Sequence, residues 1–114
     1  MATLRAQGIT WKQAESHEVV MPLLKAMYEE FKVFGKKKPN GALGKNKIAV
    51  VNRLLEQCCV VLQSEASLAF LDLLDEDDVP QNSDVVLTLS QYVVAMEQFK
   101  KRYWTWDKEW FISD

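Results

Sequence analysis

DVVLTLSQYVVAMEQFKKR, residues 84–102, holds the clearest structural pattern in the chain. Large apolar side chains recur in it every three or four residues, which is the spacing that places them on one face of an α-helix. Its last three residues are basic, and cations are favourable at the carboxyl end of a helix. We therefore expect an amphipathic helix here, with Asn82 or Ser83 as its cap and Asp84 near its positive end. The apolar stripe consists of Val85, Leu89, Tyr92, Val93, Met96, Phe99 and Tyr103.

Two further amphipathic stretches lie on the amino-terminal side of residues 84–102. In residues 45–63, apolar side chains again form one seam at helical spacing. In residues 20–34 the same spacing recurs, and Gly35 follows as a natural carboxyl-terminal stop. Both stretches therefore predict helices that bury one face. The two seams consist of Ile48, Val51, Leu55, Cys58 and Leu62, and of Val20, Leu23, Leu24, Met27, Phe31 and Phe34.

Pro22 interrupts the pattern near the start of the chain. Thr10 and Gln13 have the spacing of a capping box, which predicts a helix start at that point. Either that helix is short and ends near Met21, or Pro22 occupies the first turn of a new helix, where its missing N–H has no cost. The second interpretation is favoured, and both predict a break between two helices.

The segment SLAFLDLL, residues 67–74, is apolar on nearly every side. Helical segments of that kind are normally buried, so we expect it to lie at the centre of the fold. Together these patterns predict an all-α, single-domain bundle of four to five helices over residues 1–114. Residues 1–9 are expected to be a flexible start, and residues 103–114 an aromatic tail. The expected core consists of Leu23, Leu24, Met27, Phe31, Ile48, Val51, Leu55, Leu62, Leu68, Leu71, Leu89, Val93, Met96 and Phe99.

Charge is strongly segregated along the chain, although the net charge is only −2. Residues 31–53 hold seven basic side chains and no acidic one, and residues 54–99 hold nine acidic side chains and no basic one. Unless folding brings the two segments together, the molecule should have a positive and a negative place on its surface. Such places are either solvated linkers or docking surfaces that speed encounter with a partner. Head-to-tail self-association is a third interpretation.

The lysine-rich stretch GKKKPNGALGKNK, residues 35–47, resembles a phosphate-binding loop in composition only. Such a loop needs a glycine where this chain has Pro39, a Ser or Thr where it has Asn46, and a preceding strand. A looser anion site at the start of a helix near Lys45 remains open. So does contact with nucleic-acid phosphates. The candidate residues for an anion or a nucleic acid are Lys36, Lys37, Lys38, Lys45, Lys47 and Arg53.

The tail YWTWDKEWFISD, residues 103–114, concentrates aromatic side chains. Either it folds back over the bundle and closes the core, or it exposes an anchor for a second protein chain. If the last helix continued, Tyr103, Trp106 and Trp110 would share a face. The candidate protein-interaction residues are Trp104, Trp106, Trp110 and Phe111.

No pattern in the sequence predicts a catalytic or metal site. The acidic run that begins at Asp75 fails as a calcium loop, because Pro80 stands where glycine is required. His17, the single histidine, is expected on an exposed helical turn. Cys58 and Cys59 are adjacent, so a disulfide between them is strained and zinc-ligand spacing is lacking. We expect no cofactor, no metal and, on balance, no enzyme.

The sequence therefore predicts a non-catalytic, intracellular protein-interaction or regulatory module that binds a protein partner or itself. The alternative is a nucleic-acid-associated accessory protein that uses the basic residues 35–53. Two unpaired thiols are typical of a reducing compartment, and the amino-terminal residues show no apolar leader, which favours the cytoplasm. The longest apolar stretch, residues 85–96, is too short to cross a membrane.

Overall fold

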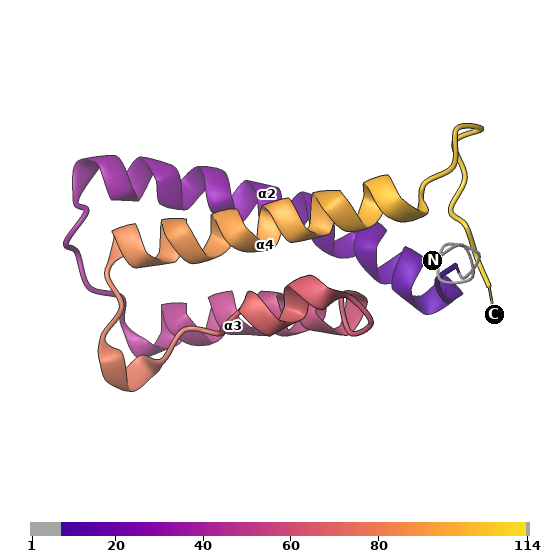
Figure 1. The fold of residues 1–114 in the computed structure, drawn as a ribbon. Helices are drawn as coiled ribbons and strands as arrows, with labels where there is room; N and C mark the ends of the chain where they lie inside the picture. The colour runs from indigo at the N-terminus through magenta and orange to yellow at the C-terminus, as the bar shows by residue number, and fades with distance from the viewer. Residues whose placement is uncertain (1–7, 114) are drawn as a thin grey trace.

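The computed structural model describes residues 8–113. Over that range the chain forms three α-helices, two short 3₁₀-helices and no β-strand, which confirms the all-α class (Figure 1). The expected count of four to five helices is wrong. The elements are α2 (Trp11–Lys37), α3 (Lys45–Val61), η1 (Ala66–Phe70), η2 (Glu76–Asp78) and α4 (Asn82–Tyr103).

Helix α4 is the predicted helix of residues 84–102, extended by a few residues. Its stripe is buried from Val85 to Phe99, and Tyr103 is half-buried. The predicted caps are wrong, because Gln81 precedes the helix and its N–H donates to the Asp84 carboxylate (2.9 Å). The Asn82 side-chain amide instead donates to the backbone carbonyl of Lys38 (2.9 Å) and joins α4 to the end of α2.

Helix α2 runs without interruption through Pro22, so both interpretations of a break at this residue are wrong. The capping box at its start is confirmed, since the Gln13 N–H donates to Thr10 Oγ1 and the Thr10 N–H to Gln13 Oε1. Proline removes one hydrogen bond from a helix, and Figure 1 shows that the axis of α2 changes direction along its length. Pro22 lies on the exposed side, where water reaches the carbonyl that lost its donor. Gly35 lies inside the helix, which continues to Lys37.

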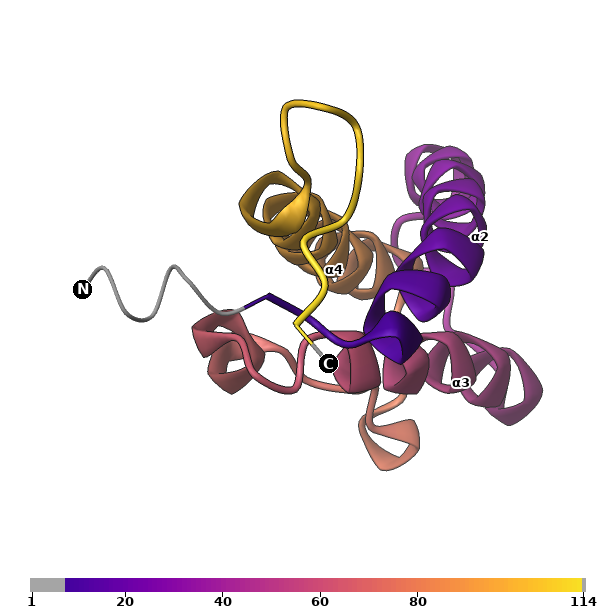
Figure 2. The ribbon, with the colours of Figure 1, turned by 90° about the vertical axis from the view of Figure 1, so that its right-hand side faces the viewer.

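The three helices surround one core, and α2 runs antiparallel to both α3 and α4 (Figures 1 and 2). Ten of the fourteen expected core residues are buried, and Met27, Leu68 and Leu71 are half-buried. The prediction that Leu23 belongs to the core is wrong, because 56% of its surface is exposed. The buried ten are Leu24, Phe31, Ile48, Val51, Leu55, Leu62, Leu89, Val93, Met96 and Phe99.

The segment of residues 67–74 is not the buried central helix that its composition predicted. Part of it forms η1, none of whose residues is buried, and Phe70 is 79% exposed. The segment runs as a connection from α3 back to the start of α4, because those helices are parallel and must be joined by a long crossing (Figure 1). The Asn52 side chain holds it by exchanging two hydrogen bonds of 2.8 Å with the backbone of Leu74. The Tyr92 hydroxyl donates to the Asp72 carbonyl (3.1 Å).

The basic and acidic linkers lie at the same end of the molecule, so the expectation of separate charged places is wrong for them (Figure 1). Residues 39–43 and 80–83 are joined by backbone hydrogen bonds, such as Leu43 N–H to the Pro80 carbonyl (2.9 Å) and Asn82 N–H to the Gly41 carbonyl (2.8 Å). Within residues 8–113 no ion pair links a lysine of the basic stretch to an acid of η2. Both sets of charges therefore face solvent beside one another.

The chain ends close the other end of the bundle. Ile9 is buried and pairs with Ile112 in an isolated parallel bridge, and the Ile9 N–H donates to the Phe111 carbonyl (2.9 Å). A Cβ atom on Gly8 would stand 2.2 Å from the Phe111 oxygen, so this close approach of two backbones requires glycine. The expected flexible start otherwise falls on residues 1–7, which lie outside the described residues.

Candidate functional site

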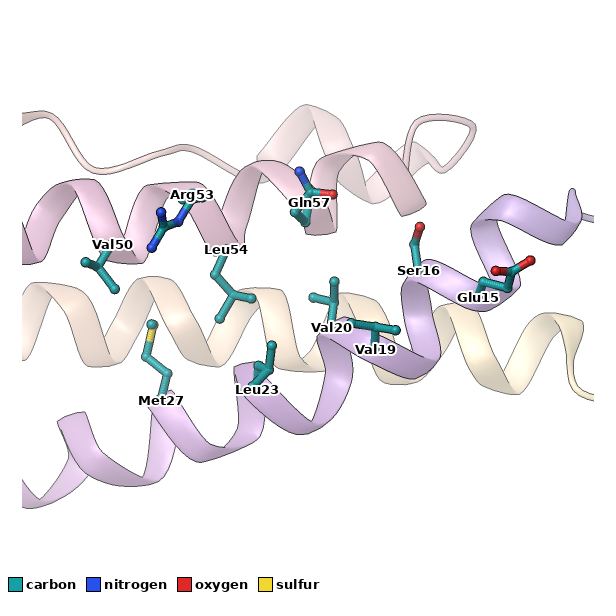
Figure 3. Close-up of a pocket in the computed structure, with 10 residues that line it drawn as sticks. All are labelled: Glu15, Ser16, Val19, Val20, Leu23, Met27, Val50, Arg53, Leu54 and Gln57. Carbon is teal, nitrogen blue, oxygen red and sulfur yellow. The ribbon is translucent and has the colours of Figure 1, made fainter.

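An open groove of about 550 Å³ runs between α2 and α3 on the side of the bundle away from α4 (Figure 3). Its floor and walls are mainly aliphatic, and polar side chains occur toward its edges. Ten residues line it: Glu15, Ser16, Val19, Val20, Leu23, Met27, Val50, Arg53, Leu54 and Gln57.

Large apolar side chains in this groove remain exposed to water. Val19, Leu23 and Val50 are each about half exposed or more, while Met27 and Leu54 are half-buried. They come from two antiparallel helices and face the same space, so they form one contiguous apolar strip (Figure 3). Single exposed aliphatic residues are ordinary on a protein surface, but contiguous patches mark sites of interaction.

This groove is not among the predicted sites, because the apolar spacing of residues 20–34 assigns Leu23 to the core. A signal for it exists in α2, whose apolar residues form two neighbouring stripes. One stripe follows Val20, Leu24 and Phe31, and the other follows Val19 and Leu23. A single core contact cannot cover an arc of that width.

The groove carries opposite charges toward its two ends. Glu15 lies near the amino-terminal end of α2, and Arg53 lies at the middle of α3, toward the opposite end of the groove (Figure 3). Both side chains are exposed, and neither forms an ion pair with another residue of the described range. The electrostatic potential of the groove is therefore polarised along its length.

The predicted basic residues are gathered, with one exception, at the end of the bundle where α2 ends and α3 begins. Lys36, Lys37 and Lys38 close α2, and Lys45 and Lys47 lie in the first turn of α3. All are exposed. The exception is Arg53, which lies farther along α3 and lines the groove. A role of these side chains in binding an anion stays a prediction.

The aromatic tail packs against its own chain. Helix α4 ends at Tyr103, so Trp106 and Trp110 do not continue its face, and Trp104 pairs with Trp110 in an isolated antiparallel bridge. Trp104, Trp110 and Phe111 are partly buried. Trp106 is 94% exposed. A role of the tail in protein contact stays a prediction, and in this structure Trp106 is the member that faces solvent most fully.

A second groove, of about 1,050 Å³, lies between α2, the end of α4 and the turn that follows it. His17 contributes to its wall, although it is only 2% exposed, so the expectation of a surface histidine is wrong. Its Nε2–H donates to the Met96 carbonyl (2.9 Å), and its ring stacks on Phe99 (5.7 Å between centroids) and meets Trp110 edge-on (5.1 Å). His17 thus joins α2 to α4 and to the tail.

Burial lowers the pKa of His17 below its ordinary value of 6.5, and the nearby Lys100 and Lys25 lower it further. The hydrogen bond to Met96 and the charge of Glu18 oppose this shift. The folded chain therefore holds a neutral imidazole at neutral pH.

This shift predicts acid sensitivity through His17. Below pH 6.5 the unfolded chain binds a proton at His17 that the folded chain resists, so the free energy of unfolding falls as the pH decreases through that region. Urea denaturation of the wild type and of His17→Gln, measured from pH 7.5 to pH 5, tests this. We expect the wild type to lose more stability across this range than the variant does. Equal losses would contradict the assignment to His17.

The cysteines carry no sign of nucleophilic chemistry. Burial raises the pKa of the Cys58 thiol to about 12, so it is protonated at neutral pH. The Cys59 thiol lies 3.7 Å from the Tyr92 hydroxyl, and both thiols are free. Among residues 8–113, no three His, Cys, Asp or Glu side chains are close enough together to hold a metal ion.

None of the helices in the described range is both long enough and apolar enough to cross a bilayer. No family model, no curated protein and no solved structure matches this chain.

Proposed function

We propose that this chain is a non-catalytic protein-interaction module that associates with a second copy of itself through the groove between α2 and α3. The observation that carries this proposal is the contiguous strip of exposed aliphatic side chains around Leu23. Covering that strip removes apolar surface from water, and this is the main driving force of most protein association. Two antiparallel helices that meet two others complete a four-helix arrangement.

The charges of the groove favour a second copy as the occupant. A two-fold axis that lies in the interface and crosses the groove at a right angle reverses its ends, so each helix of one copy lies antiparallel to the same helix of the other. That rotation brings the Glu15 end of the groove in one copy to the Arg53 end of the groove in the other. The same rotation repeats the contact on the other side, so each dimer has two such pairs. The groove is therefore electrostatically complementary to itself.

A dimer interface of standard size needs more surface than the groove alone. The chain exposes 7,744 Å², and a standard interface buries about 800 Å² from each partner, or about a tenth of a small protein's surface. The groove alone exposes less than that, so the contact must also bury the exposed shoulders of α2 and α3 along several turns of each helix. We expect an association that depends on protein concentration.

Leu23→Ala tests the apolar strip. Alanine is a strong helix former and Leu23 is exposed in the single chain, so the variant should fold normally. A dimer contains two substituted side chains, and each should cost about 1 kcal/mol of binding free energy. The dissociation constant should therefore rise about 30-fold. Sedimentation velocity over a range of concentrations measures this. The matched control is Leu87→Ala on α4, which removes a side chain of similar exposure (62%) from another face.

A wild-type chain that is monomeric at every concentration overturns self-association. An equal weakening by Leu23→Ala and Leu87→Ala moves the interface away from this groove and overturns the site. The proposed result is a concentration-dependent dimer that is weakened by the first substitution and not by the second.

We further propose that the chain works in a reducing compartment such as the cytoplasm. Cys58 and Cys59 are both free thiols, and proteins of oxidising compartments rarely leave thiols unpaired. Labelling with a thiol reagent in native cell extract tests this. We expect both thiols to be labelled fully when the extract is denatured without a reductant. Labelling that occurs only after a reductant is added overturns the proposal of a reducing compartment.

A further inference from the structure

The turn that follows α4 exposes the indole ring of Trp106 to solvent. Trp104 and Trp110 pair across the turn and their rings meet edge-on (5.2 Å between centroids). The Thr105 N–H donates to the Glu109 carbonyl (2.7 Å), and the Lys108 N–H donates back to the Thr105 carbonyl (3.0 Å). This hydrogen-bonded turn places Trp106 at its tip, 94% exposed. The turn is ordered by hydrogen bonds, yet no other side chain covers the Trp106 ring. A large aromatic ring held in this way is well placed to stack on a ligand.

Four lysines line the groove with this ring, and one of them, Lys25, is paired with Glu97. Lys100 and Lys101 come from the last turn of α4, and Lys108 comes from the turn itself. Lys108 has a left-handed backbone (φ 67°), which aims the chain sharply back after Trp106. The Lys100 ammonium lies 4.4 Å from the centre of the Trp104 ring, so a cation and an aromatic face are already combined here.

The acidic residues of the same groove are engaged by neighbours. Glu18 accepts a hydrogen bond from the Trp110 indole (2.8 Å), and Glu97 lies 3.9 Å from the ammonium of Lys25. The lysines that flank Trp106 have no such carboxylate partner within residues 8–113. The residues that line the groove therefore carry more lysines than carboxylates, and Asp107 and Glu109 add two exposed carboxylates in the turn itself.

We propose that this groove binds single-stranded nucleic acid, with a base stacked on Trp106 and the neighbouring phosphates on Lys100, Lys101 and Lys108. Exposed aromatic rings beside lysines are the elements from which single-strand sites are built, because every base has a face that stacks and every nucleotide has a phosphate. Duplex DNA hides its base faces, so it cannot use the indole in this way. A membrane surface also takes up indole rings beside lysines, and the vesicle measurement below separates it from a nucleic acid.

The proposal places nucleic-acid contact at the opposite end of the bundle from the basic stretch of residues 35–47. The nearest ring to those lysines is Phe34, which packs edge-on against Phe31 (5.6 Å) and lies below the Lys47 ammonium (5.4 Å). That stretch therefore also combines charge with a partly exposed ring, but Phe34 is 41% exposed and Trp106 is 94% exposed. The groove at Trp106 and the basic stretch of residues 35–47 can be tested separately, because each can be substituted without changing the other.

Fluorescence anisotropy of a labelled single strand of about 10 nucleotides, at about 50 mM salt and above, tests the proposal. Trp106→Ala should weaken binding about tenfold, and Phe70→Ala, which removes a ring from η1 that is 79% exposed, should leave it unchanged. Replacing Lys100, Lys101 and Lys108 together with Ser should reduce the slope of log affinity against log salt by about 2. The same replacement of Lys36, Lys37 and Lys38 removes equal charge at the other end and should leave most of the affinity intact. Circular dichroism confirms that each variant is folded.

Three results overturn the proposal. The first is no binding of the wild type at about 50 mM salt. The second is an affinity that falls as much when Lys36, Lys37 and Lys38 are replaced as when the groove lysines are replaced, or that is unchanged in Trp106→Ala. The third is binding of the wild type to anionic lipid vesicles without binding to the oligonucleotide, which assigns the turn to a membrane surface.

Discussion

Phe99→Ala is expected to lower the free energy of unfolding by about 3–5 kcal/mol, a large part of the 5–15 kcal/mol that stabilises a typical domain. Phe99 is fully buried at the point where α2, α4 and the tail meet. Its ring stacks on His17, packs against Tyr103 (5.0 Å between centroids) and lies 6.1 Å from Trp110. Alanine would leave a cavity beneath three aromatic neighbours that cannot close around it without moving their own backbones.

Urea denaturation followed by circular dichroism measures this loss, at one fixed protein concentration because self-association adds to stability. The control is Phe70→Ala, since Phe70 is mostly exposed and should change stability by less than about 0.5 kcal/mol. Similar losses in the two variants would show that the aromatic junction around Phe99 does not stabilise the fold.

Helix α4 could be predicted because its pattern is unambiguous. Seven apolar side chains at helical spacing form one continuous stripe, and no proline or glycine interrupts them. Helix α3 was predicted equally well, from Lys45 onward, for the same reason. Periodicity depends on local geometry alone, so it succeeds wherever a single face is buried.

Pro22 and His17 were misjudged because tertiary contacts outweigh local preferences. Pro22 costs α2 one hydrogen bond, but α2 packs on both other helices, and that packing holds the helix together across the gap. His17 stands among Glu15, Ser16 and Glu18, which indicates an exposed turn. Its burial depends on Met96 and Trp110, which lie far away in the sequence.

The groove between α2 and α3 could be predicted only in part. The width of the apolar arc on α2 indicates that more surface is available than one core needs, and Leu23 lies on that arc. Which stripe faces the core depends on where α3 and α4 pack, and a single helix does not contain that information. The same limit applies to the tail. Trp104, Trp106 and Trp110 are the same residue type, and only the turn between them decides which of the three is exposed.

Reversing one charge of the groove is expected to raise the dissociation constant of the dimer about a hundredfold. In Arg53→Glu, each Glu15 faces another carboxylate, and in Glu15→Arg, each Arg53 faces another guanidinium. A dimer has two such pairs, and each pair changes from attraction to repulsion, at a cost of about 1–1.5 kcal/mol. Both side chains are exposed in the single chain, so folding should be unaffected.

Mixing the two single variants at equal concentration, followed by sedimentation velocity, tests the central claim most directly. If two copies meet groove to groove about a two-fold axis, a mixed dimer pairs carboxylate with guanidinium at both positions. The account predicts that each variant alone is mostly monomeric and that the mixture dimerises nearly as well as the wild type. A mixture that stays as monomeric as its two components would contradict it.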